Sequence, residues 1–342
     1  MKLRFLALTL TAVVGFLLNS STTISVATQN LEAGGTKIAL INKSALGESS
    51  NSRSETISKP LEEFAKRHDF ALLVDSSKIK SAILASEDWV DLTQEFIAES
   101  KRKESSETTK AVSNVSNSKI ALVWTEDFYD KKSGIKGLAG QAPAIRALDG
   151  KILDALARFA KLNGITIMLD STKLPGIISA SESMDVTRAF IAFYNGGASN
   201  MSAKLTIPDT KVVIMSTDTF ADERIGIAPL VQAMDRVDRE FLPLKKELEA
   251  MKARLGTLSG KQRQDLSDEF ERKGQKAKAD YQKRMEEAIG PVYNEIGKAV
   301  DQFANDGGIN LVLDSSKFPI AVAASSIDKT TLFIMEYNQR HR

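Results

Sequence analysis

The chain has 342 residues, 46 basic and 44 acidic side chains, no cysteine and two histidines. Without cysteine there is no disulfide framework, no thiolate nucleophile and no cysteine-ligated metal, and two histidines leave little room for a histidine metal site or a histidine-based triad. The near-neutral charge argues against nucleic acid as a partner, because clustered positive charge supplies most of the affinity for phosphates. The length and the 42% hydrophobic share fit a globular protein with a real core.

The first 27 residues have the three parts of a secretory signal. Lys2 and Arg4 form a positive start, residues 5–18 are an almost unbroken apolar run, and Ser25-Val26-Ala27 has small residues at the two positions that a signal peptidase reads. The run is shorter than the ~20 residues that cross a bilayer, although an uncleaved anchor is the alternative. We therefore expect a signal peptide over residues 1–27, a soluble protein exported to the periplasm, and no integral membrane segment after cleavage.

Three segments repeat the same marks in the same order, which indicates three copies of one unit. Each opens with a Lys and a short apolar run rich in β-branched residues, typical of a strand buried on both faces. A second apolar run ends in Asp, and a Phe-Ala pair precedes that Asp at one fixed distance. The marks are Lys37, Lys119 and Lys211 for the opening, Phe64, Phe159 and Phe303 for the aromatic residue, and Asp75, Asp170 and Asp314 for the acid.

Each unit closes with an Asp-x-Thr sequence ahead of Phe-Ile. This pattern predicts a third extended segment followed by a short helix, with the Asp as its N-cap accepting from free amides of the first turn. The predicted caps are Asp91, Asp185 and Asp328. The predicted units are residues 36–100, 119–195 and 211–338, called units one, two and three below.

The Asp-Ser-Ser/Thr-Lys sequence after each second strand invites a catalytic interpretation, as a serine–lysine nucleophile or a carboxylate site. A polar cluster directly after a strand is more simply a turn in which Asp bonds nearby amides. Nothing near it supplies a base and a group to orient that base. The sequence has no phosphate-binding loop and no dinucleotide fingerprint. We expect no catalytic, cofactor-binding or metal-binding residues, and hence no enzyme.

Unit three is longer than the others, and its surplus follows a helical pattern. Apolar residues over 230–255 alternate steps of four and three, the seam of a left-handed coiled coil. Residues 256–260 supply a reversal, and a charged helical stretch then returns with a second apolar face. The pattern predicts an antiparallel hairpin, the arm, over about residues 229–303. Pro243 and Pro291 should bend it, because each ring removes a helical hydrogen bond.

Unit three resembles a whole subunit of the Skp/OmpH family of periplasmic chaperones, over roughly residues 211–338. The resemblance rests on the strand after Lys211, the long charged hairpin, the passage from Phe303 to Asp314 and the close at Asp328-x-Thr330. Units one and two resemble the same subunit with the hairpin deleted. Family members are exported homotrimers whose strands combine into one barrel-like body and whose helical arms hold unfolded outer-membrane proteins. This chain departs from them in having one arm for three units and a near-zero charge.

The expected fold class is α+β: three tandem strand-helix-strand units forming a small barrel-like body, plus one antiparallel α-helical coiled-coil hairpin. A single unit has too few strands to cover its edges, and exposed edges invite pairing. Because three units lie on one chain, we expect a monomeric pseudo-trimer in preference to a homotrimer.

The resemblance implies an ATP-independent holdase that binds unfolded outer-membrane or other exported proteins. The alternative is a non-catalytic envelope scaffold whose arm docks one defined partner. An apolar stripe on a hairpin usually serves to join its two helices. Client contact needs apolar residues beyond that seam, and Met suits it because it adapts to varied partners. The candidate client contacts are Met234, Met251, Phe270 and Met285.

Overall fold

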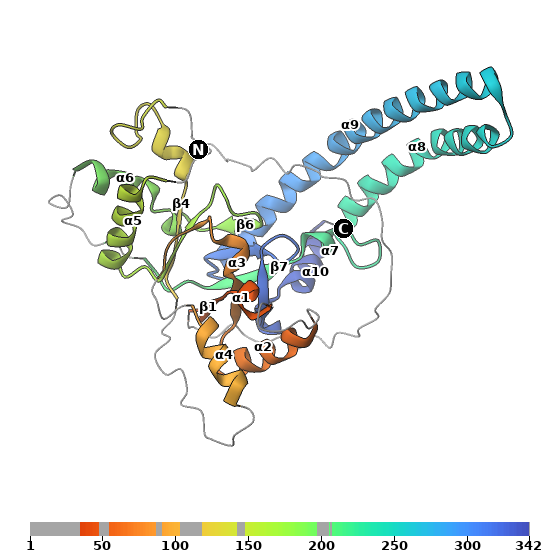
Figure 1. Ribbon diagram of the computed structural model, residues 1–342. Helices are drawn as coiled ribbons and strands as arrows, with labels where there is room; N and C mark the ends of the chain where they lie inside the picture. The colour runs from red at the N-terminus through yellow and green to blue at the C-terminus, as the bar shows by residue number, and fades with distance from the viewer. Residues whose placement is uncertain are drawn as a thin grey trace. The chain divides into compact units, whose positions relative to one another are not determined.

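The computed structural model describes residues 35–47, 55–86, 91–102, 118–141, 148–196, 205 and 207–341. The predicted signal peptide, residues 1–27, lies outside them. Within these ranges the chain is mixed α and β, with small three-stranded sheets and two long helices (Figure 1). None of the described helices is both long and apolar enough to cross a membrane.

A parallel strand pair forms two of the three strands of each sheet. In each pair the opening strand lies beside the strand that ends in Asp, with a helix in the connection, as parallel neighbours require. All of these strands are buried along their whole length, as their continuous apolar runs predict. The pairs are β1 (Ile38–Ile41) with β2 (Leu72–Asp75), β4 (Ile120–Val123) with β5 (Ile167–Asp170), and β7 (Val212–Met215) with β8 (Leu311–Asp314).

The third strand of each unit leaves its own pair and joins another one. β3 (Ile83–Ser86) pairs antiparallel with β5, β6 (Ile177–Ala180) with β8, and β9 (Ile320–Ala323) with β2. The sheet orders are therefore β1-β2-β9, β3-β5-β4 and β6-β8-β7. Unit one lends a strand to unit two, unit two to unit three, and unit three to unit one. The exchange is cyclic, and it places each Asp-ending strand in the middle of its sheet.

The strands divide their side chains between one shared core and three separate ones. In β1, Ile38 and Leu40 point into a cluster that also takes alternate residues from every other parallel strand. Their neighbours Ala39 and Ile41 point into a second cluster, whose buried members all come from unit one and against which Ala321 of β9 packs. This is the alternation expected of a strand. Units two and three have clusters of their own in the same position.

Each separate core is covered by a connecting helix and a closing helix. The Phe of the Phe-Ala pair meets the Phe of the closing Phe-Ile edge to face, with ring centroids 5.4 Å apart for Phe64 and Phe96. The corresponding separations are 5.6 Å in unit two and 5.7 Å in unit three. The connecting helices are α2 (Glu55–Arg67), α5 (Gly150–Asn163) and the end of α9 (Gly260–Asp306), and the closing helices are α4 (Thr93–Arg102), α6 (Thr187–Gly196) and α10 (Thr330–Arg340).

Three buried hydroxyl residues at the entrances of the opening strands close a ring. The backbone nitrogen of Thr36 donates to the oxygen of Thr210 (2.8 Å), Thr210 donates to Ser118 (2.9 Å), and Ser118 donates back to Thr36 (3.4 Å). Their side-chain oxygens accept from backbone nitrogens at the starts of β1, β4 and β7, at 3.1 Å, 2.8 Å and 2.9 Å. The ring therefore joins the three units around the shared core.

The predicted arm is a hairpin of α8 (Ala228–Leu255) and α9, which run side by side (Figure 1). Pro243 and Pro291 both lie inside these helices. The α+β class and the hairpin are thus confirmed, whereas the barrel-like closure of the units stays a prediction. The short helices are α1 (Lys43–Gly47), α3 (Ser76–Ile79), η2 (Thr125–Tyr129), η3 (Glu182–Met184), α7 (Thr217–Phe220) and η5 (Ser325–Ile327).

Units two and three share a loop that the sequence analysis did not identify. In unit three, Asp222 accepts from the backbone nitrogens of Arg224 (2.9 Å) and Ile225 (3.1 Å), and Asn338 donates to the oxygen of Gly226 (3.0 Å). These amide donors lower the pKa of Asp222. A side chain on Gly226 would collide with the backbone of Asp222, so only Gly fits.

The loop of unit two has the same contacts. Asp130 accepts from two backbone nitrogens at 2.9 Å and 2.8 Å, and Asn195 donates to the oxygen of Gly134 (3.0 Å). In unit three the loop leads directly into α8. In unit two the chain makes one turn and then passes Gly137 and Gly140, which have φ of 94° and 81°. Unit two therefore contains the loop that precedes the arm in unit three, but the loop does not lead into an arm.

Candidate functional site: the helical arm

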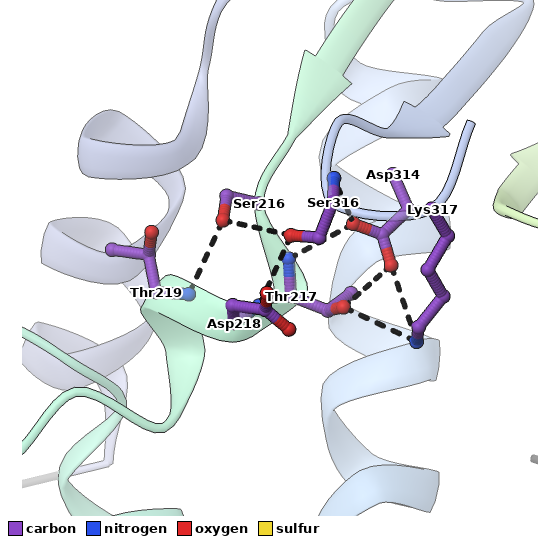
Figure 2. Close-up of polar contacts among 7 residues, drawn as sticks. All are labelled: Ser216, Thr217, Asp218, Thr219, Asp314, Ser316 and Lys317. Carbon is purple, nitrogen blue, oxygen red and sulfur yellow. Dashed lines mark hydrogen bonds and ion pairs between the residues drawn. The ribbon is translucent and has the colours of Figure 1, made fainter. Parts of the chain in front are cut away.

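The polar cluster at the end of β8 is built around Asp314, which is 1% exposed. Its Oδ1 accepts from the backbone nitrogens of Ser316 (3.0 Å) and Thr217 (3.2 Å). Its Oδ2 accepts from Oγ1 of Thr217 (2.5 Å) and pairs with Nζ of Lys317 (3.2 Å), as Figure 2 shows. Burial of a carboxylate is costly unless such partners surround it.

This cluster ties strand ends together. Thr217 follows β7 and Ser316 follows β8, so one carboxylate holds the two parallel strands side by side at their ends. Lys317 donates to both Asp314 and Thr217, whereas a general base must accept a proton. Asp170 has the equivalent bonds to Thr125, Thr172 and Lys173 in unit two, and Asp75 bonds Ser77 and the backbone of Lys43 in unit one. The geometry favours the structural interpretation of the repeated motif.

The Asp-x-Thr closes have an equally structural geometry. Asp328 accepts from the backbone nitrogen (2.9 Å) and Oγ1 (2.7 Å) of Thr330, the first residue of α10. Oγ1 of Thr330 in turn accepts from the nitrogen of Ser216 at the end of β7 (2.9 Å). The Asp therefore lies one residue before the N-cap, and its Thr attaches the closing helix to the opening strand. Asp91 with Thr93 and Asp185 with Thr187 repeat this arrangement.

Across the described residues, no group of three or more His, Asp or Glu side chains is placed to hold a metal ion. The remaining candidate site is the arm. Its base belongs to the core of unit three, where Leu230 and Val237 of α8 are fully buried with Ile296 and Val300 of α9. Farther out, the two helices have little other than each other to pack against.

One edge of the arm is held by ion pairs across the two helices. Arg284 on α9 binds both carboxylate oxygens of Glu240 on α8 at 3.0 Å, and Nζ of Lys273 lies 2.6 Å from Glu247. These acceptors raise the pKa of both cations. Glu240 and Glu247 are seven residues apart, so they share one face of α8.

The opposite edge is open and forms an apolar groove with a volume of about 560 Å³. Phe241 and Tyr281 meet edge to face at 5.3 Å and close its end towards the base. The hydroxyl of Tyr281 donates to Asp238 (2.7 Å), and burial together with this carboxylate raises the pKa of Tyr281 to about 12. The apolar lining is Phe241, Leu242, Leu244 and Leu248 from α8 and Phe270, Ala277 and Tyr281 from α9.

Small residues on α9 create the groove. Gly274 lines it and has open space where a side chain would begin, and Ala277 lies one turn further on. Leu244 and Leu248 on α8 line the same groove and stay half-buried. An unpacked apolar side chain forgoes many favourable dispersion contacts, so the groove is a place where another apolar group can gain them.

The four predicted client contacts lie in different environments. Phe270 is half-buried and lines the groove. Met251 and Met285 are 6% and 7% exposed, so both lie inside the hairpin, and Met234 packs against the core at its base. The sequence analysis missed the groove residues on α8. The available signal was the pair of small residues, Gly274 and Ala277, facing a stretch rich in Leu.

Comparison with known proteins agrees with the assignment of the arm. Residues 227–337 match the protein family described as "Outer membrane protein (OmpH-like)". The match runs from the residue before α8 into α10 and thus contains the arm, β8 and β9. No curated protein matches the chain. Residues 227–337 are therefore similar to this OmpH-like family.

Proposed function

We propose that the protein is a periplasmic holdase of the Skp/OmpH type, which binds unfolded outer-membrane or other exported proteins through its arm without ATP. The observation that carries this proposal is the open apolar groove on a helical hairpin inside the OmpH-like segment. Weak, reversible contact with many clients requires apolar surface that the fold has not consumed, and the groove supplies it.

The proposal is tested by suppression of aggregation. The full chain should keep several unrelated unfolded substrates soluble at near-stoichiometric ratios. A variant that lacks residues 242–281, with a short Gly turn joining Phe241 to Gln282, should still fold, because the ion pair between Arg284 and Glu240 remains at the new tip. It should lose the protection, because the groove has been removed. An envelope scaffold would protect none of these substrates, and equal protection by both chains would separate the activity from the arm.

We further propose that the three units close one barrel-like body within a single chain, as a pseudo-trimer. The cyclic exchange of β3, β6 and β9 and the core shared by every parallel strand support this. The exchange leaves each Asp-ending strand paired on both sides. Light scattering should therefore give the mass of one chain, whereas a mass of three chains would favour bodies formed between chains.

A further inference from the structure

We propose that the arm groove binds one extended segment of a partner polypeptide, with a large apolar side chain between two carboxylates. This proposal rests on the holdase function above and names the class of segment that the arm selects. It follows from three features of the groove: its apolar floor, the charges on its rim and the spacing of those charges.

The floor of the groove fits a single apolar side chain. Phe241 and Tyr281 close it towards the base, and Phe270 lies at its outer part. The half-buried Leu244 and Leu248 face Gly274 between these ends. An aromatic or large aliphatic side chain placed opposite Gly274 would cover these leucines and remove apolar surface from water.

The rim of the groove carries an excess of positive charge. Lys245, Lys252 and Lys278 line it, and none of them has an ion pair within the described part of the chain. Two carboxylates also line the groove: Asp238 accepts the hydroxyl of Tyr281, and Glu249 lies between the two lysines of α8, so three lysines against two carboxylates leave an excess of one positive charge. The cations on the other edge of the arm, by contrast, are held by carboxylates of α8. The unpaired lysines therefore complement an acidic segment.

The spacing of the lysines indicates an extended partner. Lys245 and Lys252 are seven residues apart on α8, which corresponds to ~10 Å along the helix axis. In an extended chain of the polyproline II type, with three residues per turn and a rise of about 3.1 Å, carboxylates three residues apart lie on one face and are separated by ~9 Å. A segment of the form acidic-apolar-x-acidic can thus place a carboxylate at each lysine and its apolar side chain over Leu248. Lys278 on α9 lies across the groove and adds a third cation.

The test measures fluorescence anisotropy of short labelled peptides with the full-length protein. The first peptide contains Asp-Phe-Ser-Asp, the second replaces both Asp by Lys, and the third replaces Phe by Ser. The first should bind at least about tenfold more tightly than either of the others, and added salt should weaken it. Equal affinity for all three peptides would overturn the proposal.

Matched variants locate the binding in the groove. Gly274→Leu fills it and should reduce affinity about tenfold, whereas Gly274→Ala raises helix propensity with little filling and should retain binding. The triple variant Lys245→Gln, Lys252→Gln, Lys278→Gln should lose binding. The control Lys246→Gln, Arg272→Gln, Lys276→Gln removes the same charge from exposed positions outside the groove. An equal loss in this control would show general attraction to the arm and sink the proposed site.

The two proposals fail in different ways. If the protein suppresses aggregation but does not discriminate among the peptides, the groove proposal is wrong and the holdase proposal stands. If it binds the first peptide but suppresses no aggregation, the groove stands and the holdase proposal fails. If the protein self-associates without peptide and Gly274→Leu abolishes this self-association, the occupant of the groove is a second copy of the chain. That result would overturn the proposal of a partner segment.

Discussion

The hydroxyl groups of Thr36, Ser118 and Thr210 show how single residues connect distant parts of this chain. Each precedes an opening Lys, and each accepts from the first strand of another unit. The repetition of Thr or Ser at this position is visible in the sequence, but the repeat does not reveal which unit each hydroxyl bonds. That pairing depends on the cyclic order of the units, which only their packing decides.

Removal of one hydroxyl from this ring should destabilise the protein. Thr210→Val leaves the buried backbone nitrogen of Ile120 without its acceptor, at a cost of about 1–3 kcal/mol in the free energy of unfolding. Thr210→Ser keeps the acceptor and should cost less. Urea denaturation measures both, with the exposed Thr331→Val as the control, expected within about 0.5 kcal/mol of the unmodified chain. Equal effects of Val and Ser at position 210 would contradict the hydrogen-bond explanation.

The shared loop makes a prediction about acid. Backbone amides lower the pKa of Asp222 below its ordinary 3.8, so the ionised form stabilises the folded state. This contribution is present above the unfolded pKa and is lost as the pH falls through the folded one. The difference in unfolding free energy between the unmodified chain and Asp222→Asn should shrink from pH 6 to pH 3. A difference that is independent of pH would show that the carboxylate charge plays no part.

At the scale of elements, the sequence periodicity predicts the two helices of the arm but not how they pack against each other. The steps of four and three over residues 230–255 predict the first helix, and the second apolar face predicts the returning one; Met251, on the first seam, is buried. Periodicity within one helix does not give the register between two helices. The register decides that Gly274 lies in the groove lined by Leu244 and Leu248, and hence that one edge of the hairpin is open. The groove therefore requires the structure.

The pairing partners of the third strands, β3, β6 and β9, likewise cannot be predicted from their own sequences. The apolar runs predict the opening and Asp-ending strands, because these are buried on both faces. A four-residue segment such as β6 contains nothing that chooses between β5 of its own unit and β8 of the next. Its register on β8 is also irregular between Ile177 and Ser179. The exchange of strands is consequently a property of the assembled chain rather than of any one segment.

Tyr281 provides a test of the closed end of the groove. Its folded pKa of about 12 exceeds the ordinary 10.0, so the folded state holds the phenol proton more tightly. The resulting stability is present below pH 10 and is lost as the pH rises from 10 to 12. Tyr281→Phe should be less stable at pH 8 by up to about 1 kcal/mol, and this gap should close above pH 10. Chemical denaturation at both pH values checks it, and a gap that persists at pH 11.5 would contradict the role of Asp238.

At the scale of the whole molecule, the loop shared by units two and three explains how one arm can coexist with three units. In unit three, Ile227 accepts from the nitrogens of Leu230 and Val231 as α8 begins. In unit two, Ile135 accepts from the nitrogens of Leu138 and Ala139, although Gly137 inside that turn has a φ of 94° and no helix follows in the described residues up to 141. In unit one the stretch at the corresponding place, residues 48–54, contains neither Asp nor Gly, so the residue types that form the loop in units two and three are missing from its sequence.

Unit two should therefore accept a second arm. Replacing residues 139–147 by residues 231–291 extends the chain from the hydrogen-bonded turn that follows Ile135 and rejoins it shortly before α5. The grafted chain should remain folded and monomeric, with higher helicity by circular dichroism and a cooperative thermal transition. Two arms on one body raise the effective concentration of binding sites, so aggregation should be suppressed at lower protein concentration.

The control is the same graft placed between α1 and α2 of unit one. The sequence of unit one lacks the Asp and Gly residues of the loop that precedes the arm in unit three. Equal folding of both grafts would show that the loop does not specify where an arm can be inserted. Loss of the cooperative transition only in the graft on unit two would show that its turn cannot be extended into an arm.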